Sequence, residues 1–143
     1  MNQVINRFRH QRWQFVFFAL LAAAILAGGY QQNHRFDGIG EVSIHDAKSL
    51  IDSGALVIDV RGEDKYQSRH IPGALSIPLA ILRMGIPGSL AHAQDKPILV
   101  YCNDGVTTGP EGTQILNQAG YKQAVNVKAG IEGWADAGLP VQK

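Results

Sequence analysis

The stretch KPILVYCNDGVTTGPEG, from Lys96 to Gly112, holds the pattern that decides the fold. Its apolar run Pro97–Tyr101 predicts a buried strand that ends at Cys102, the only cysteine of the chain. The segment Thr108–Glu111 predicts the start of a helix, because proline is tolerated in a first helical turn, where its missing N–H has no partner. A strand, a short loop and a helix start therefore converge on one thiol.

The loop after the cysteine has the features of an anion-binding cradle. It consists of small or polar residues, namely Asn103, Asp104, Gly105, Val106 and Thr107. Successive N–H groups and the positive end of a helix can surround an anion without a charged side chain, and such a place favours a thiolate. A lone cysteine is often only a small buried hydrophobe. The glycine in the loop and the helix start nevertheless favour a nucleophile.

Outward from this stretch, apolar runs alternate with helical patterns. Leu56–Val60 is a nearly continuous apolar run, which is typical of a central parallel strand covered on both faces. Shorter strands are predicted at Val42–Ile44, Ala74–Ile77 and Ala124–Val127, helices at His45–Ser53, Glu63–Arg69, Pro78–Met84 and Ile131–Ala137, and a loop at Gly85–Asp95. This alternation predicts an α/β domain with a mainly parallel sheet flanked by helices. Ligands bind such sheets at the carboxyl ends of the strands, where Asp59 and Cys102 both fall.

Composition and charge narrow the class of protein. The chain has 143 residues, of which 45% are hydrophobic and 17% charged, which fits one globular domain with a short extension. The net charge is +1, and from Gln31 onward 12 acidic residues outnumber 10 basic ones. We therefore expect no nucleic-acid partner.

The N-terminal residues predict a membrane segment. Phe15–Gly29 is uncharged, follows three arginines and is flanked by Trp13 and Tyr30, so that residues 13–30 would contact the membrane. The run is short, since it spans about 22 Å against a hydrocarbon core of about 30 Å. We expect residues 1–14 in the cytoplasm, 15–30 as an anchor in the cytoplasmic membrane, 31–40 as a linker, and 41–143 as a domain on the periplasmic or exterior side. A signal peptide cleaved near Tyr30, which releases the domain to the periplasm, is the alternative.

Three motifs together closely resemble a single-domain rhodanese: IDVRGEDKYQSRHIPGALSIPL at 58–79, CNDGVT at 102–107 and GYKQAVNVKAGIEGWADAGLPV at 120–141. The resemblance covers about 42–141. It implies a three-layer fold with a five-stranded, mainly parallel core. It also implies a cysteine, here Cys102, that accepts a sulfane sulfur as a persulfide and passes it to a thiol or cyanide. The cradle would be the backbone of 103–107, the donor would be of the thiosulfate or mercaptopyruvate class, and no cofactor would be needed.

The loop departs from the family in its charge. Thiosulfate-using members often carry cations there, whereas this loop has Asp104 and neither arginine nor lysine, which argues against thiosulfate as the donor. Its GVT ending resembles the mercaptopyruvate-using branch, whose donor is less charged. Arg69 stands where the family usually has glycine and could supply the missing cation, although an exposed arginine is the default.

Other polar residues near the strand ends are expected to have structural roles. Asp59 and Arg61 could contact substrate, but a structural ion pair is favoured. His70 is expected to stabilise a turn. Three histidines, His34, His45 and His92, lack metal-ligand spacing, so no metal site is expected.

Two rival enzyme classes fit poorly. A phosphatase on this fold would need an arginine in the loop to clamp phosphate, and a thiol-disulfide oxidoreductase would need a second cysteine. The remaining alternative is a non-catalytic module at the membrane that carries sulfur or binds a partner.

Overall fold

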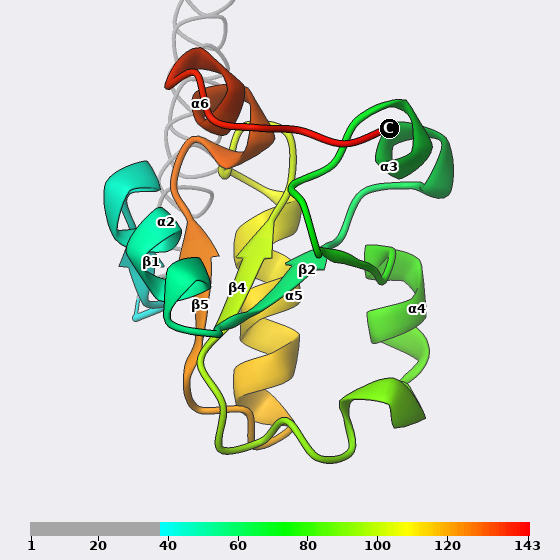
Figure 1. Ribbon diagram of the computed structural model, residues 1–143. Coiled ribbons are helices and arrows are strands. Elements are labelled where there is room, and N and C mark those ends of the chain that lie inside the picture. Colours follow the sequence, from blue (N-terminus) through cyan, green and yellow to red (C-terminus); the bar gives the residue numbers. More distant parts are fainter. Residues whose placement is uncertain (1–37) are drawn as a thin grey trace, which may run out of the picture. The chain divides into compact units, whose positions relative to one another are not determined.

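The computed structural model describes residues 38–143, which form a five-stranded sheet in which all strand pairs are parallel (Figure 1). The strands are β1 (Glu41–Val42), β2 (Leu56–Asp59), β3 (Leu75–Ser76), β4 (Ile98–Tyr101) and β5 (Ala124–Val127), and their order in the sheet is β1-β5-β4-β2-β3. The helices are α2 (Ile44–Asp52), α3 (Glu63–Ser68), α4 (Leu79–Met84), α5 (Thr108–Gln118) and α6 (Gly130–Asp136), with a 3-10 helix η1 (Gly88–Leu90). The predicted α/β class is confirmed.

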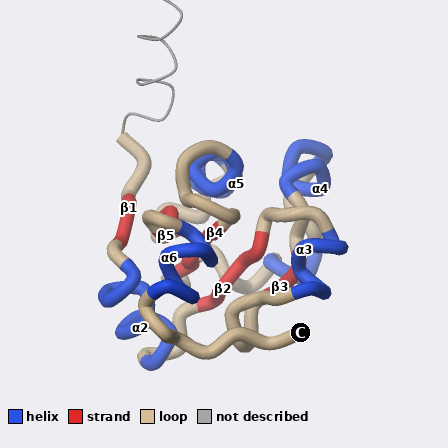
Figure 2. The backbone as a smooth tube through the Cα atoms, turned by 90° about the horizontal axis from the view of Figure 1, so that it is seen from above, coloured by secondary structure: helices blue, strands red, loops and turns tan. Residues whose placement is uncertain are grey.

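Alternation along β4 divides the core into two layers. Ile98, Val100 and Cys102 face the side of the sheet that α4 and α5 cover, whereas Leu99 and Tyr101 face the side that α2 and α6 cover. Figure 2 shows these two pairs of helices on opposite sides of the strands. All four residues of β4 are 0% exposed, so the strand that leads to Cys102 is fixed by packing on both faces.

The first strand and helix differ from the prediction, in which Val42–Ile44 was a strand. The strand β1 ends at Val42, and Ile44 already belongs to α2, because Ser43 caps the helix: its Oγ accepts a hydrogen bond from the N–H of Asp46 at 3.1 Å. The predicted strand at Ala74–Ile77 is shorter than expected, and the predicted loop at Gly85–Asp95 contains η1.

The membrane predictions concern another part of the chain. Among residues 38–143, no helix is long and apolar enough to cross a membrane. The predicted anchor at 15–30, the basic segment before it and most of the linker lie outside the described residues.

Candidate active site

Cys102 lies where β4 ends, with only 2% of its surface exposed. Its Sγ accepts a hydrogen bond from the N–H of Gly105 at 3.2 Å, so the loop turns back over the sulfur. Gly105 has φ +74°, and a Cβ on it would lie 2.6 Å from the carbonyl oxygen of Val127 and 2.7 Å from the nitrogen of Ala129. Only glycine fits this position, both for its backbone conformation and for its space.

The amino end of α6 holds the same loop from the other side. The N–H of Ile131 donates to the carbonyl of Cys102 at 2.9 Å, and the N–H of Glu132 donates to the carbonyl of Asn103 at 3.0 Å. These are helix N–H groups that have no partner inside α6. They point the two carbonyls of the loop toward α6 and away from the thiol.

The amino end of α5, where Gly109 packs near the sulfur, leaves backbone donors free. The N–H of Glu111 donates to the carbonyl of Thr107 at 3.1 Å, and Pro110 has no N–H. Within 38–143, the N–H groups of Thr107, Thr108 and Gly109 make no hydrogen bond. A helix start also carries partial positive charge, so this side of the site can receive an anionic ligand.

The carboxylate of Asp104 both caps the loop and contacts the thiol. Its Oδ1 accepts a hydrogen bond from the N–H of Val106 at 3.0 Å, as Asp often does in turns. The same oxygen lies 3.5 Å from Sγ of Cys102, as a weak acceptor for the thiol. The carboxylate therefore contacts the sulfur while it caps the loop.

Two glycines of α5 are explained by close packing. Gly109 is buried; a Cβ there would collide with Oδ1 of Asn126 and would lie 3.3 Å from Sγ of Cys102. A Cβ on Gly112 would lie 3.0 Å from Cγ1 of Val60. Both glycines weaken the helix as such, but they let α5 approach the thiol and the sheet.

Asp59 and Arg61 form a buried ion pair beneath the loop. Nη2 of Arg61 lies 2.6 Å from Oδ2 of Asp59, and the two side chains are 5% and 0% exposed. Burial alone would lower the pKa of Arg61, but the hydrogen bonds and the charge of Asp59 outweigh it and raise the pKa above its ordinary value. The ion pair favoured by the sequence analysis is therefore present. The pair also reaches the loop, because Nη1 of Arg61 donates to Oδ1 of Asn103 at 3.4 Å.

Tyr101 completes this buried support. Burial, and then the neighbouring Asp59 carboxylate, raise its pKa far above the ordinary value for tyrosine. Its hydroxyl therefore stays protonated, and it accepts a hydrogen bond from the N–H of Ile71 at 3.1 Å. The guanidinium of Arg61 lies 5.5 Å from the centre of its ring.

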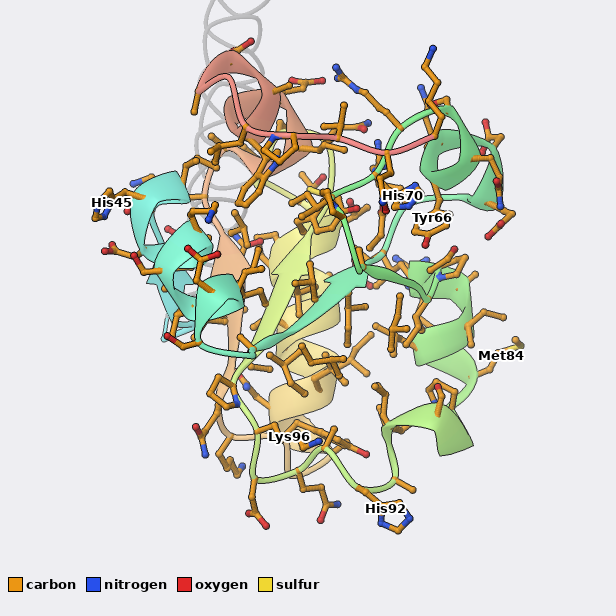
Figure 3. All side chains as sticks on the ribbon, viewed as in Figure 1. His45, Tyr66, His70, Met84, His92 and Lys96 are labelled. Atoms are coloured by element: carbon orange, nitrogen blue, oxygen red, sulfur yellow. The ribbon has the colours of Figure 1, made fainter. Side chains whose placement is uncertain are left out.

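Arg69 and His70 serve the turn after α3. The carbonyl of Arg69 accepts from Nη2 of Arg61 at 2.6 Å, whereas its guanidinium makes no hydrogen bond or ion pair with residues 38–143. The backbone of His70 pairs with Gln142 through two hydrogen bonds of 2.8 and 2.9 Å, and its ring stacks on that of Tyr66 at 4.0 Å (Figure 3). The predicted turn role of His70 agrees with these contacts, and among the described residues Arg69 makes no hydrogen bond or ion pair with the loop around Cys102.

The described residues include no cluster of three or more histidine, cysteine, aspartate or glutamate side chains placed to hold a metal ion. His45 and His92 point outward from different ends of the domain (Figure 3), and His34 lies outside the described residues.

Asn126 is the site residue that was not expected from the sequence. It is 0% exposed in β5, and its Nδ2 donates to the carbonyl of Gly105 at 2.8 Å and to Oε1 of Glu41 at 3.0 Å. Its Oδ1 is buried without a hydrogen-bond partner among the residues described. A single amide inside the apolar strand AVNV was the available signal, but its partners are distant in sequence.

Comparisons of the sequence with known proteins identify the family. The model of the rhodanese-like domain family matches residues 43–137. The uncharacterized protein YibN of Escherichia coli is 27% identical over 134 residues, which cover 93% of this chain and 91% of that protein. The thiosulfate sulfurtransferase GlpE of Coxiella burnetii is 32% identical over 95 residues, 66% of this chain and 85% of that one.

Solved structures agree with the sequence matches. The crystal structure of a rhodanese-related protein from Thermoplasma volcanium superposes with a TM-score of 0.63 and 26% identity, and the match covers 72% of this chain and 97% of that one. The chain belongs to the family of rhodanese-like domains.

Proposed function

We propose that the protein is a sulfurtransferase that carries a sulfane sulfur as a persulfide on Cys102. The observation that carries this proposal is the hydrogen bond of 3.2 Å from the N–H of Gly105 to Sγ, in a loop whose carbonyls are held away by α6. N–H groups fixed in advance around a sulfur stabilise negative charge on it, as an oxyanion hole does for oxygen. The name of the GlpE relative supports the activity at the level of the family.

The reaction divides into two displacements at sulfur. The thiolate of Cys102 attacks the outer sulfur of the donor, an S–S bond to Cys102 forms, and the donor's own bond to that sulfur breaks. Thiosulfate would leave as sulfite and mercaptopyruvate as pyruvate, the latter after taking up a proton. An acceptor thiolate or cyanide then attacks the outer sulfur of the persulfide and regenerates the thiolate of Cys102.

The loop backbone supplies the binding groups in this proposal. The N–H of Gly105 donates to the sulfur, and the free N–H groups at Thr107–Gly109 receive the charged end of the donor or the persulfide. Asp59 and Arg61 act through Asn103, whose amide oxygen they support, and do not contact the donor. Arg69 is left as a residue of the neighbouring turn.

The charge of the loop favours a donor that is less charged than thiosulfate. Oδ1 of Asp104 lies 3.5 Å from Sγ and already occupies the N–H of Val106, so a dianion would meet both a repelling carboxylate and a filled donor group. We therefore place a donor of the mercaptopyruvate class ahead of thiosulfate.

The test is the intact mass of the full chain after incubation with each donor. We expect a gain of one sulfur atom on Cys102, faster with mercaptopyruvate than with thiosulfate, and no gain in Cys102→Ser. Transfer to cyanide or a thiol, measured as thiocyanate or as new persulfide, would show turnover. If sulfur is gained but not passed on, the protein is the non-catalytic carrier described above; sulfur transfer retained in Cys102→Ser would refute the mechanism.

We further propose that residues 15–30 anchor the chain in the cytoplasmic membrane, with the domain on the periplasmic or exterior side. The uncharged run behind three arginines supports this orientation. The similarity to YibN covers 93% of the chain, so it necessarily includes this run. Protease added to intact spheroplasts should remove the domain, and in inverted vesicles it should not. A soluble product that begins near Tyr30 would instead show a cleaved signal peptide.

A further inference from the structure

The peptide group between Gly105 and Val106 is held at both ends. Its carbonyl accepts a hydrogen bond from Nδ2 of Asn126 at 2.8 Å, and its N–H donates to Oδ1 of Asp104 at 3.0 Å. Since that oxygen also lies 3.5 Å from Sγ of Cys102, the N–H points toward the side of the thiol and the carbonyl points into the protein.

The orientation of this peptide group contributes to the charge near the sulfur, next to the N–H of Gly105, which belongs to the preceding peptide group and donates to Sγ. A rotation of the group by half a turn would bring the carbonyl oxygen to the thiol side and remove the N–H of Val106 from it. Glycine at 105 allows such a rotation more readily than any other residue, because its backbone is restricted least. Something else must therefore hold the group in the orientation that favours an anion.

Asn126 is built to hold this orientation. It is 0% exposed, and its Nδ2 is fixed by a second acceptor, Oε1 of Glu41 in β1, at 3.0 Å. The two acceptors also determine which end of the amide is the NH₂ group, since the reversed amide would set its oxygen against two other oxygens. Oδ1 then points to Gly109 and has no hydrogen-bond partner within 38–143, so the amide bears the cost of an unsatisfied acceptor in order to place Nδ2 on its two partners.

We propose that Asn126 is a positioning residue for sulfur transfer: it holds the carbonyl of Gly105 in the interior so that the loop presents N–H groups to the sulfur of Cys102. This inference rests on the proposed function. It concerns the orientation of one peptide group, and Asn126 does not contact the donor.

Asn117 offers a matched control on the same side of the sheet. Its Nδ2 also donates to two carbonyls, those of Tyr121 and Ala124, at 2.9 and 3.0 Å. These contacts lie at the amino end of β5, whereas Asn126 and the thiol lie toward the carboxyl ends of the strands. Asn117→Ala therefore removes a similar pair of hydrogen bonds without a contact to the loop.

The experiment measures the rate at which iodoacetamide alkylates Cys102 in the full chain, from pH 5 to 10, for Asn126→Ala and Asn117→Ala. Removing one preorganised donor typically costs about a hundredfold or more in a catalysed step, so a loop that loses part of its cradle should alkylate roughly tenfold more slowly at neutral pH in Asn126→Ala. The midpoint of its pH profile should also move upward. Asn117→Ala should keep the parent profile, although we expect urea unfolding to show that both variants are less stable.

Equal pH profiles in the two variants would overturn the proposal. If Asn126→Ala does not fold, Asn126→Ser decides, because its shorter hydroxyl cannot reach the carbonyl of Gly105 but can bind a water in the space left. The unaltered chain gives an independent measurement: the NMR signals of the Asn126 side-chain amide should follow the ionisation of Cys102, and those of Asn117 should not. The proposal would also be overturned if the signals of Asn126 do not change with this ionisation, or if they change with pH to the same extent in Cys102→Ser.

Alkylation needs no sulfur donor, so failure of this inference can be distinguished from failure of the proposed function. A slowed alkylation in Asn126→Ala together with no persulfide from either donor would refute sulfur transfer and keep the positioning role. Normal alkylation in Asn126→Ala together with persulfide formation would refute the positioning role and keep sulfur transfer.

Discussion

The substitution Asp104→Asn tests the charge of the loop while it preserves the shape. Asparagine can keep the hydrogen bond of 3.0 Å from the N–H of Val106, because its Oδ1 stands where the carboxylate oxygen stood. It removes one negative charge 3.5 Å from Sγ of Cys102. The perturbation is therefore electrostatic, and the loop should stay in place.

The expected effect follows from this distance. Two unit charges at 3.5 Å interact by about 1.2 kcal/mol at a dielectric of 80 and by about 4.7 kcal/mol at 20. Asp104 is exposed, so we take the lower value, which raises the thiolate fraction about sevenfold below neutral pH. A less basic thiolate is a weaker nucleophile, with a Brønsted slope of about 0.4 to 0.5, which leaves a gain of about threefold in alkylation.

In Asp104→Asn, the reaction rate should rise more with charged donors than with iodoacetamide. A dianion about 6 Å from the carboxylate is relieved of about 1.4 kcal/mol, or roughly tenfold, and a monoanion of half that energy, or roughly threefold. Thiosulfate turnover, measured as thiocyanate formed, should therefore rise more than mercaptopyruvate turnover. At about 1 M salt, where the Debye length is about 3 Å, the difference between Asp104→Asn and the parent should largely disappear.

Asp95→Asn is the control for net charge, because Asp95 precedes β4 at its other end. It should change neither alkylation nor donor preference. If Asp104→Asn leaves alkylation unchanged at every salt concentration, or slows it, the carboxylate acts only as a cap for the loop and the argument from repulsion is wrong.

Four further substitutions test the support of the site. Gly109→Ala should slow alkylation of Cys102 and lower the free energy of unfolding by at least about 2 kcal/mol, since its Cβ has no room. In Gly112→Ala, about 1 kcal/mol of helix propensity offsets the closer contact, so the free energy of unfolding in urea should stay within about 1 kcal/mol of the parent. Ala129→Gly should be neutral or stabilise by up to about 1 kcal/mol in the same measurement, because φ is +66° there; a clear loss would show that its methyl group packs usefully. Arg61→Met should cost about 3 to 5 kcal/mol, since it leaves the carboxylate of Asp59 buried without its partner, and a cost below about 1 kcal/mol would mean that water replaces the guanidinium.

The parts of the fold that follow from local pattern could be predicted from the sequence. The strand Ala124–Val127 has the predicted bounds, and Cys102 directly follows the last residue of β4, one position from the predicted strand end, because apolar runs between turn residues carry this information within a few positions. The early start of α2 could also have been found, since Ser43 and Asp46 have the spacing of a helix cap.

Contacts across the fold could not be read in the same way. Gly109 is a poor helix residue by propensity, and only the position of Asn126 explains it. Asn126 in turn looks like an interruption of an apolar strand until the carbonyl of Gly105, 21 residues earlier, is seen against its amide. Such residues are unfavourable by local propensity because their partners lie on other strands and loops, and the hydrophobic periodicity of a sequence does not report such partners.

The hydrogen bonds from α6 also determine when, during synthesis, the loop around Cys102 takes its shape. Cys102 and its strand emerge from the ribosome well before Asn126, Ile131 and Glu132, which supply three of the hydrogen bonds that shape the loop. Contacts between such distant segments form only after the chain between them has closed. A nascent chain that ends before Ile131 lacks these hydrogen bonds, so the loop around Cys102 takes its full shape only after α6 has been made.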